Sequence, residues 1–246
     1  QGPNTKAISA STIHNTGSVD WNAGPITVVS GTVIDNSGGW NAFSDDAINF
    51  AGGAGVLFDN HGAFTKSGGS DVTSVGLPFH NANLVSAFVG TIRFASTLTS
   101  DAGHFRTLTG TSIEFPSINT FNLGTLFDGP GLFRFSGNST VDGLVIAQRS
   151  EISGGNFGVN PGGEFRVNDS LDWLGGTLGA GGGVFRVIAS ASANLTGPND
   201  KAISALTLQN DGHVNWTNGN IVTVSGAVFD NRNTFSILGG NQISFA

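Results

Sequence analysis

The residues of this chain that could perform acid–base chemistry are carboxylates, and they are few and scattered. Asp45 and Asp46 are adjacent, and glycoside hydrolysis uses a pair of carboxylates. Adjacent side chains of a strand point to opposite faces, so these two cannot form a catalytic pair on their own. Solvation at the surface accounts for the acids that stand singly, which include Glu114, Asp128, Asp142, Glu151, Glu164 and Asp172. We therefore expect no catalytic residues and predict that the protein is not an enzyme.

Metal and cofactor chemistry has no recognisable motif either. The chain has no Cys, and we find no metal-ligand spacing among its five His residues. Neither a Gly-Gly-x-Gly-x-Asp calcium array nor a Gly-x-Ser-x-Gly nucleophile motif occurs. We expect no metal and no cofactor. The His residues are His14, His61, His80, His104 and His213.

Half of the ten cationic residues share one motif, Gly-x-Ile/Phe-Arg. If the segments that carry it stack in register, the Arg side chains form a column on one outer face. Such a column could bind acidic polysaccharide, or it could keep a flat strand face soluble. The uneven spacing of the motif favours solubility. The five residues are Arg93, Arg106, Arg134, Arg166 and Arg186.

The elements that position these residues are short strands. Apolar and polar residues alternate within them, as in Phe165-Arg166-Val167, where one face is buried and the other is wet. The chain has 38 Gly, 19 Phe and only 11% charged residues. Frequent Gly, Asn and Asp between short apolar runs are typical of an all-β chain with many turns and almost no helix.

A short repeat ends in an Asn turn. The Asn-to-Asn steps are 21, 24 and 21 residues, which fits one coil of a parallel β-solenoid of about 20–24 residues per coil. Asn tolerates tight corners, and stacked Asn side chains can hydrogen-bond between coils. We predict structural corner or ladder positions at Asn15, Asn36, Asn60, Asn81, Asn210 and Asn231.

Aromatic residues recur at fixed places and are expected to pack in the core or at corners. The motif Leu/Val-Asp/Asn-Trp-x-x-Gly occurs three times, and Phe precedes Arg in four copies of the Arg motif. The expected positions are Trp21, Trp173, Trp216, Phe105, Phe133, Phe165 and Phe185.

A longer repeat underlies the short one. Residues 197–231 match residues 2–36 without a gap, and roughly three in five residues are identical. The chain thus contains a long repeat over residues 2–196 and a partial second copy over 197–246. We interpret residues 1–246 as one continuous solenoid segment cut from a longer array.

Three segments carry a resemblance to a known class of proteins. Residues 57–69, 77–81 and 206–221 resemble Gly/Asn-rich repeats of very large secreted bacterial surface proteins, which are adhesin-like and autotransporter-passenger-like. The resemblance implies a right-handed parallel β-solenoid, an extracellular or cell-surface location and a structural or adhesive role.

We therefore expect a segment of an extracellular filament or cell-surface shaft. Its partners would be neighbouring repeats or further copies of the chain, and polysaccharide or the cell surface is a further candidate for binding. A net charge of −7 argues against nucleic acid, and no apolar run is long enough for a membrane span. The main alternative is a secreted carbohydrate-binding or polysaccharide-degrading β-helix protein, and a tailspike-like receptor-binding protein is the third.

Overall fold

The chain folds as a parallel β-solenoid of about eleven turns, as predicted. The computed structural model describes residues 4–179, 181–224 and 226–246, and these residues contain strands and no helix. Gly2 and Pro3, with which the long repeat begins, and Ser225 of its second copy lie outside the described residues.

Each coil consists of three short strands, and each strand pairs in parallel with the strand one coil later. β2 (Thr12–Asn15) pairs with β5 (Val33–Asn36), which pairs with β8 (Leu57–Asn60). Inward residues alternate with outward ones in these strands, so every coil contributes a few apolar side chains to the interior.

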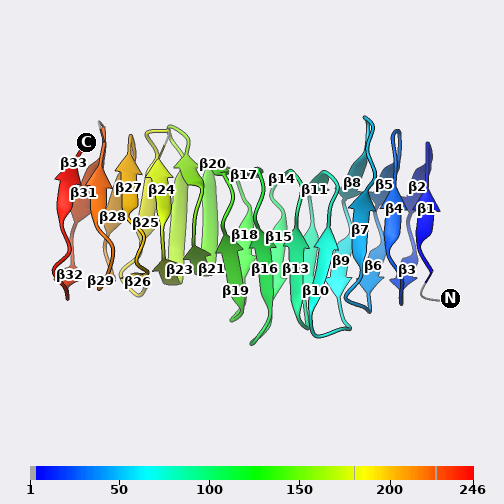
Figure 1. Cartoon of the computed structure of the whole chain (residues 1–246), viewed down its shortest axis with the longest axis horizontal. Coiled ribbons are helices and arrows are strands. Elements are labelled where there is room, and N and C mark those ends of the chain that lie inside the picture. Colours follow the sequence, from blue (N-terminus) through cyan, green and yellow to red (C-terminus); the bar gives the residue numbers. More distant parts are fainter. Residues whose placement is uncertain (1–3, 180, 225) are drawn as a thin grey trace. The chain divides into compact units, whose positions relative to one another are not determined.

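Two compact units divide the chain. Unit 1 comprises Gln1–Ile118 and Asp128–Leu132, and unit 2 comprises Asn119–Phe127 and Phe133–Ala246. In Figure 1 the strands of unit 1, blue to green, lie side by side. β18 (Leu126–Asp128) and β19 (Leu132–Phe135) contribute residues to both units.

The other strands of unit 1 form three parallel columns. The first column holds β1 (Lys6–Ile8), β4 (Ile26–Val28), β7 (Ala47–Phe50), β10 (Val72–Val75), β13 (Thr91–Phe94) and β16 (Ser112–Phe115). The second holds β2, β5, β8, β11 (Phe79–Asn81) and β14 (Leu98–Ser100). The third holds β3 (Ser18–Trp21), β6 (Gly39–Ala42), β9 (Ala63–Lys66), β12 (Leu84–Ala87) and β15 (His104–Thr107).

Unit 2 repeats this plan, with two long strands that each bend through two columns. One column holds β17 (Asn119–Asn122), β20 (Ser139–Asp142), β22 (Asn156–Val159), β24 (Gly176–Gly179), β27 (Lys201–Ser204), β30 (Ile221–Thr223) and β33 (Ile243–Phe245). The next holds the first halves of β21 (Leu144–Ile152) and β23 (Glu164–Trp173), then β25 (Val184–Val187), β28 (Thr207–Asn210) and β31 (Val228–Asn231). The last holds the second halves of β21 and β23, then β26 (Ser192–Leu195), β29 (His213–Trp216) and β32 (Thr234–Ile237).

Phenylalanine fills the interior of both units. In unit 1, the rings of Phe58 and Phe79 stack with centroids 4.9 Å apart, and in unit 2 Phe157 and Phe165 meet edge to face at 4.7 Å. All four rings are almost completely buried. Such aromatic contacts add roughly 0.5–1.5 kcal/mol each beyond the burial of apolar area.

Glycine at one corner of unit 1 permits close stacking of successive coils. A Cβ atom on Gly62 would lie 2.1 Å from the carbonyl oxygen of Gly38, and one on Gly38 would lie 2.1 Å from that of Gly17. Because backbone and not a flexible side chain occupies the space, a larger residue at Gly38 or Gly62 would push the coils apart.

The long repeat does not contain a whole number of coils. β28 comes 26 strands after its counterpart β2 (28 − 2), and β21 and β23 each occupy two strand positions, so one period holds 28 positions. At three positions per coil this is nine and one third coils.

Candidate functional site

The two adjacent carboxylates of the sequence hold a corner of unit 1 together. Asp45 Oδ1 lies 2.6 Å from Nζ of Lys66, and Lys66 is completely buried. The same ammonium donates to Oγ1 of Thr73 at 2.9 Å. Asp46 accepts hydrogen bonds from the Gly24 amide at 2.6 Å and from the hydroxyl of Ser44, two residues before it. Both acids therefore have structural partners.

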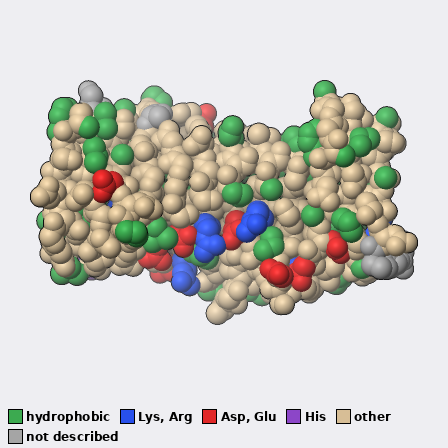
Figure 2. All heavy atoms as spheres, viewed as in Figure 1, with side chains coloured by type: hydrophobic (Ala, Val, Ile, Leu, Met, Phe, Trp, Pro, Cys, Tyr) green, Lys and Arg blue, Asp and Glu red, His purple; other side chains and the backbone are tan. Residues whose placement is uncertain are grey.

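Four of the five predicted Arg positions form ion pairs. Figure 2 shows basic and acidic side chains lying next to one another on the visible face. Arg93 and Arg106 lie in different columns of unit 1, whereas Arg166 and Arg186 are register neighbours in unit 2. The pairs are Arg93–Glu114 (2.8 Å), Arg134–Glu151 (2.7 Å), Arg166–Glu164 (2.7 Å) and Arg186–Asp211 (2.6 Å).

One of these acids, Asp211, is stabilised in its charged form. Burial alone would raise the pKa of Asp211, but hydrogen bonds from Gln209 and Arg186 outweigh it and lower the pKa below its usual value. The side chain of Asp211 is 16% exposed, which is close to the exposure of Glu114 and Glu151 in the other pairs.

The predicted Asn positions form side-chain ladders. In unit 1, Nδ2 of Asn15 donates to Oδ1 of Asn36 at 2.7 Å, Asn36 donates to Asn60 at 2.7 Å, and Asn60 donates to Asn81 at 2.8 Å. In unit 2, Asn210 donates to Asn231 at 2.7 Å. Each donor also donates to a backbone carbonyl of the following coil, so the ladder joins coil to coil. In unit 1 this corner is buried.

The recurring aromatic positions are buried. The indole Nε1 of Trp21 donates to the Gly24 carbonyl at 2.8 Å, and that of Trp216 donates to Gly219 at 2.6 Å, which explains the Trp-x-x-Gly spacing. Trp173 donates to Gly175 at 3.1 Å. Phe105, Phe133, Phe165 and Phe185 are completely buried.

Histidine and aspartate meet on the outer face of the second column of unit 1. Asp59 and His80 are opposite each other in β8 and β11, and His61 follows β8. Asp59 Oδ1 lies 2.6 Å from Nδ1 of His80 and 3.1 Å from Nε2 of His61. Nε2 of His80 lies 2.8 Å from Oδ2 of Asp101. Burial lowers the pKa of His80, but its hydrogen bonds to the two acids outweigh this and raise it.

Sequence reasoning missed this group because it searched for ligands close together in the chain. The 21-residue step that joins Asn60 to Asn81 also joins Asp59 to His80, and that step was the signal which could have revealed the cluster.

Comparison of the chain with protein-family models, with curated proteins and with solved structures finds no match. Among the residues that the structure describes, no helix is long and apolar enough to cross a membrane.

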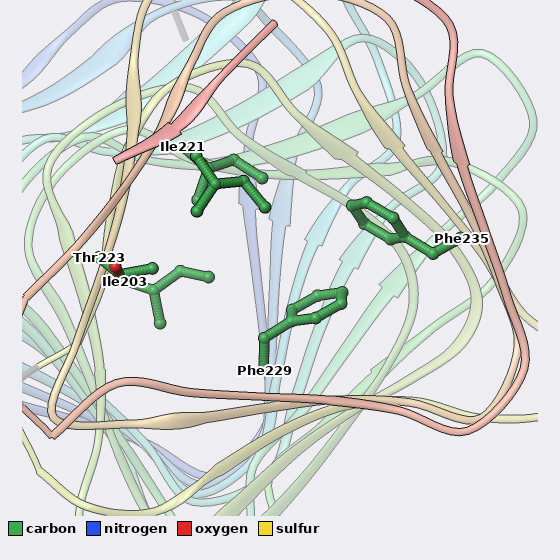
Figure 3. A pocket seen from close by; sticks show the side chains of 6 residues that line it. Ile203, Ile221, Thr223, Phe229 and Phe235 are labelled. Carbon is green, nitrogen blue, oxygen red and sulfur yellow. The ribbon is translucent and has the colours of Figure 1, made fainter. Parts of the chain in front are cut away.

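The last coil of unit 2 presents an apolar surface. Figure 3 shows Ile203, Ile221, Thr223, Phe229 and Phe235 around a pocket, which Ile243 completes. Several large apolar side chains near it are exposed, and they include Val228, Ile237, Leu238, Ile243 and Phe245. An apolar patch of this kind marks a surface suited to contact with another polypeptide segment.

Proposed function

We propose that this protein is a structural and adhesive segment of a fibre or shaft, in which coil after coil is added at the apolar surface of the last coil. The occupant we assign to that surface is a further solenoid coil, supplied by a neighbouring repeat or by another copy of the chain. Parallel backbone hydrogen bonds between coils would then run along the fibre and give it stiffness.

The observation that carries this proposal is that later strands cover equivalent strands to different extents in the two copies of the repeat. β30, β31 and β32 are the counterparts of β4, β5 and β6 at the 195-residue offset (221 − 26). In the first copy β7, β8 and β9 pair with these strands and cover them. In the second copy β33, the counterpart of β7, pairs with β30, and no later strand among the described residues pairs with β31 or β32.

Burial changes accordingly between equivalent residues. Ile34 and Ile48 are completely buried in the first copy, whereas their counterparts Phe229 and Ile243 are 36% and 57% exposed. The chain thus contains, in residues 57–66, a segment that fits the surface equivalent to β31 and β32.

The extra third of a coil in each period has a consequence for a continued array. With nine and one third coils per period, each copy would begin one strand position further around the coil. Three copies would bring a given side chain back to the same column, so the three outer faces would share the same average chemistry.

Composition and resemblance support the location and role that we propose. A chain without Cys or Met resists oxidation, which suits a long-lived extracellular material. Together with the likeness to bacterial surface repeats, this favours a non-enzymatic filament at the cell surface, with polysaccharide as a candidate ligand.

A chain extension tests the proposal. Ala246 corresponds to Ala51, so we would append a copy of residues 52–118 after Ala246. We expect slower amide hydrogen exchange in β31 and β32 and a higher melting temperature. In a control extension, Asp would replace the two residues of the appended copy that correspond to the buried Phe58 and Phe64. Equal exchange in β31 and β32 with both extensions would contradict the proposal.

A further inference from the structure

We infer that Asp59, His61 and His80 form a binding site for a divalent transition-metal cation of the Zn²⁺ class. Imidazole nitrogen and carboxylate oxygen are ligands that Zn²⁺ accepts in proteins. The three ligand atoms all lie within 4.8 Å of one another, so one ion can contact all three.

The distances fit a metal centre after a small movement. Ligand atoms around a tetrahedral Zn²⁺ lie about 3.3 Å apart when each is about 2.0–2.1 Å from the ion. Asp59 Oδ1 is 3.1 Å from His61 Nε2 and 2.6 Å from His80 Nδ1. Rotation of the exposed His61 ring and of the Asp59 carboxylate would have to widen the shorter of these distances by about 0.7 Å.

The backbone holds two of the three ligands in place. Asp59 and His80 are directly opposite in the parallel pair of β8 and β11. The adjacent residues Asn60 and Asn81 join the same strands through a buried side-chain hydrogen bond of 2.8 Å. A ligand pair on two paired strands is more precisely placed than one on loops.

Asp101 acts as an outer partner that orients His80. Its Oδ2 lies 2.8 Å from His80 Nε2, so Asp101 can accept the Nε2 hydrogen. His80 Nδ1 lies 2.6 Å from Asp59 Oδ1 and donates to it in the metal-free chain, so binding of the ion would replace that proton. A carboxylate that fixes the tautomer of a ligating His in this way is usual at metal centres.

The site is open to solvent. The side chains of His61, Asp59 and His80 are 48%, 26% and 25% exposed. A bound ion would therefore keep at least one position for water or for an external ligand, as three-ligand zinc sites do.

Zn²⁺ titration of the tag-free chain by calorimetry, with Co²⁺ absorption as a second readout, tests this inference. We expect one Zn²⁺ per chain at this site and a tetrahedral Co²⁺ spectrum. His61→Gln and His80→Gln should each weaken binding by more than about tenfold, and Asp101→Asn by about 10–100-fold. Circular dichroism of each metal-free variant checks that the solenoid is intact.

His14→Gln is the matched control, because His14 is on the same column and pairs with Asp35 at 2.9 Å. Its affinity for Zn²⁺ should equal that of the unaltered chain. The inference is overturned if the unaltered chain binds no Zn²⁺, or if His61→Gln and His80→Gln bind as tightly as His14→Gln does.

Discussion

Replacement of Asn36 by Ala should destabilise unit 1 by about 3 kcal/mol. The Asn36 amide takes part in three hydrogen bonds: it accepts from Asn15 at 2.7 Å and donates to Asn60 at 2.7 Å and to the Ala63 carbonyl at 3.1 Å. Asn36 is completely buried, so water cannot replace these partners. Each lost hydrogen bond costs about 1 kcal/mol.

The control for this prediction is Asn41→Ala. Asn41 also makes two side-chain hydrogen bonds, to Ser18 at 3.2 Å and to Asp20 at 2.9 Å, but both are exposed. Water can replace them, and we expect a loss of about 0.5 kcal/mol or less.

The assay is urea unfolding combined with hydrogen exchange, because a solenoid need not unfold in a single step. Exchange should accelerate in peptides that cover β2, β5 and β8. A double-mutant cycle of Asn36→Ala with Asn60→Ala should show a coupling energy of about 1 kcal/mol, since the two residues share a hydrogen bond. Equal losses for Asn36→Ala and Asn41→Ala, or no coupling, would refute the ladder as a source of stability.

Two further predictions concern a corner and an ion pair. Gly62→Ala should lower the melting temperature, because the new Cβ would lie 2.1 Å from the Gly38 carbonyl oxygen. Gly17→Ala is the control and should not lower it, because its Cβ would meet nothing within 4 Å. Similar melting temperatures of the two variants would contradict the close stacking of the coils. Asp211 has a lowered pKa, so its contribution to stability is present above its usual value of 3.8 and is lost as the pH falls through the lower value of the folded state. The difference in unfolding free energy between the unaltered chain and Asp211→Asn, measured by urea unfolding, should therefore shrink below pH 3.8. A difference that stays constant across that range would show that the charge of Asp211 does not contribute to stability.

Features that recur along the chain were predictable from the sequence. The steps between Asn15, Asn36 and Asn60 report the coil length, because each Asn must meet the next one at the same corner. The Trp-x-x-Gly motif likewise reports a corner, since the indole of Trp21 donates to the carbonyl of Gly24, three residues away.

Features that depend on one particular coil were not predictable. Lys66 reads as a surface residue in the sequence, yet it is buried because Asp45 and three oxygen atoms surround its ammonium. The Arg motif suggested a single column, but the motif occurs on different strands of successive coils, so Arg93 and Arg106 occupy different columns. The His and Asp cluster arises only when neighbouring coils are placed in register.

The most direct test of the fibre is cryo-electron microscopy of the native, full-length material. A solenoid that continues with the period found here predicts filaments with a spacing of about 4.8 Å between coils and an axial repeat of about 45 Å. Each repeat should be rotated by about one third of a turn in addition to the twist of the solenoid itself. Compact particles with no axial repeat would contradict the account.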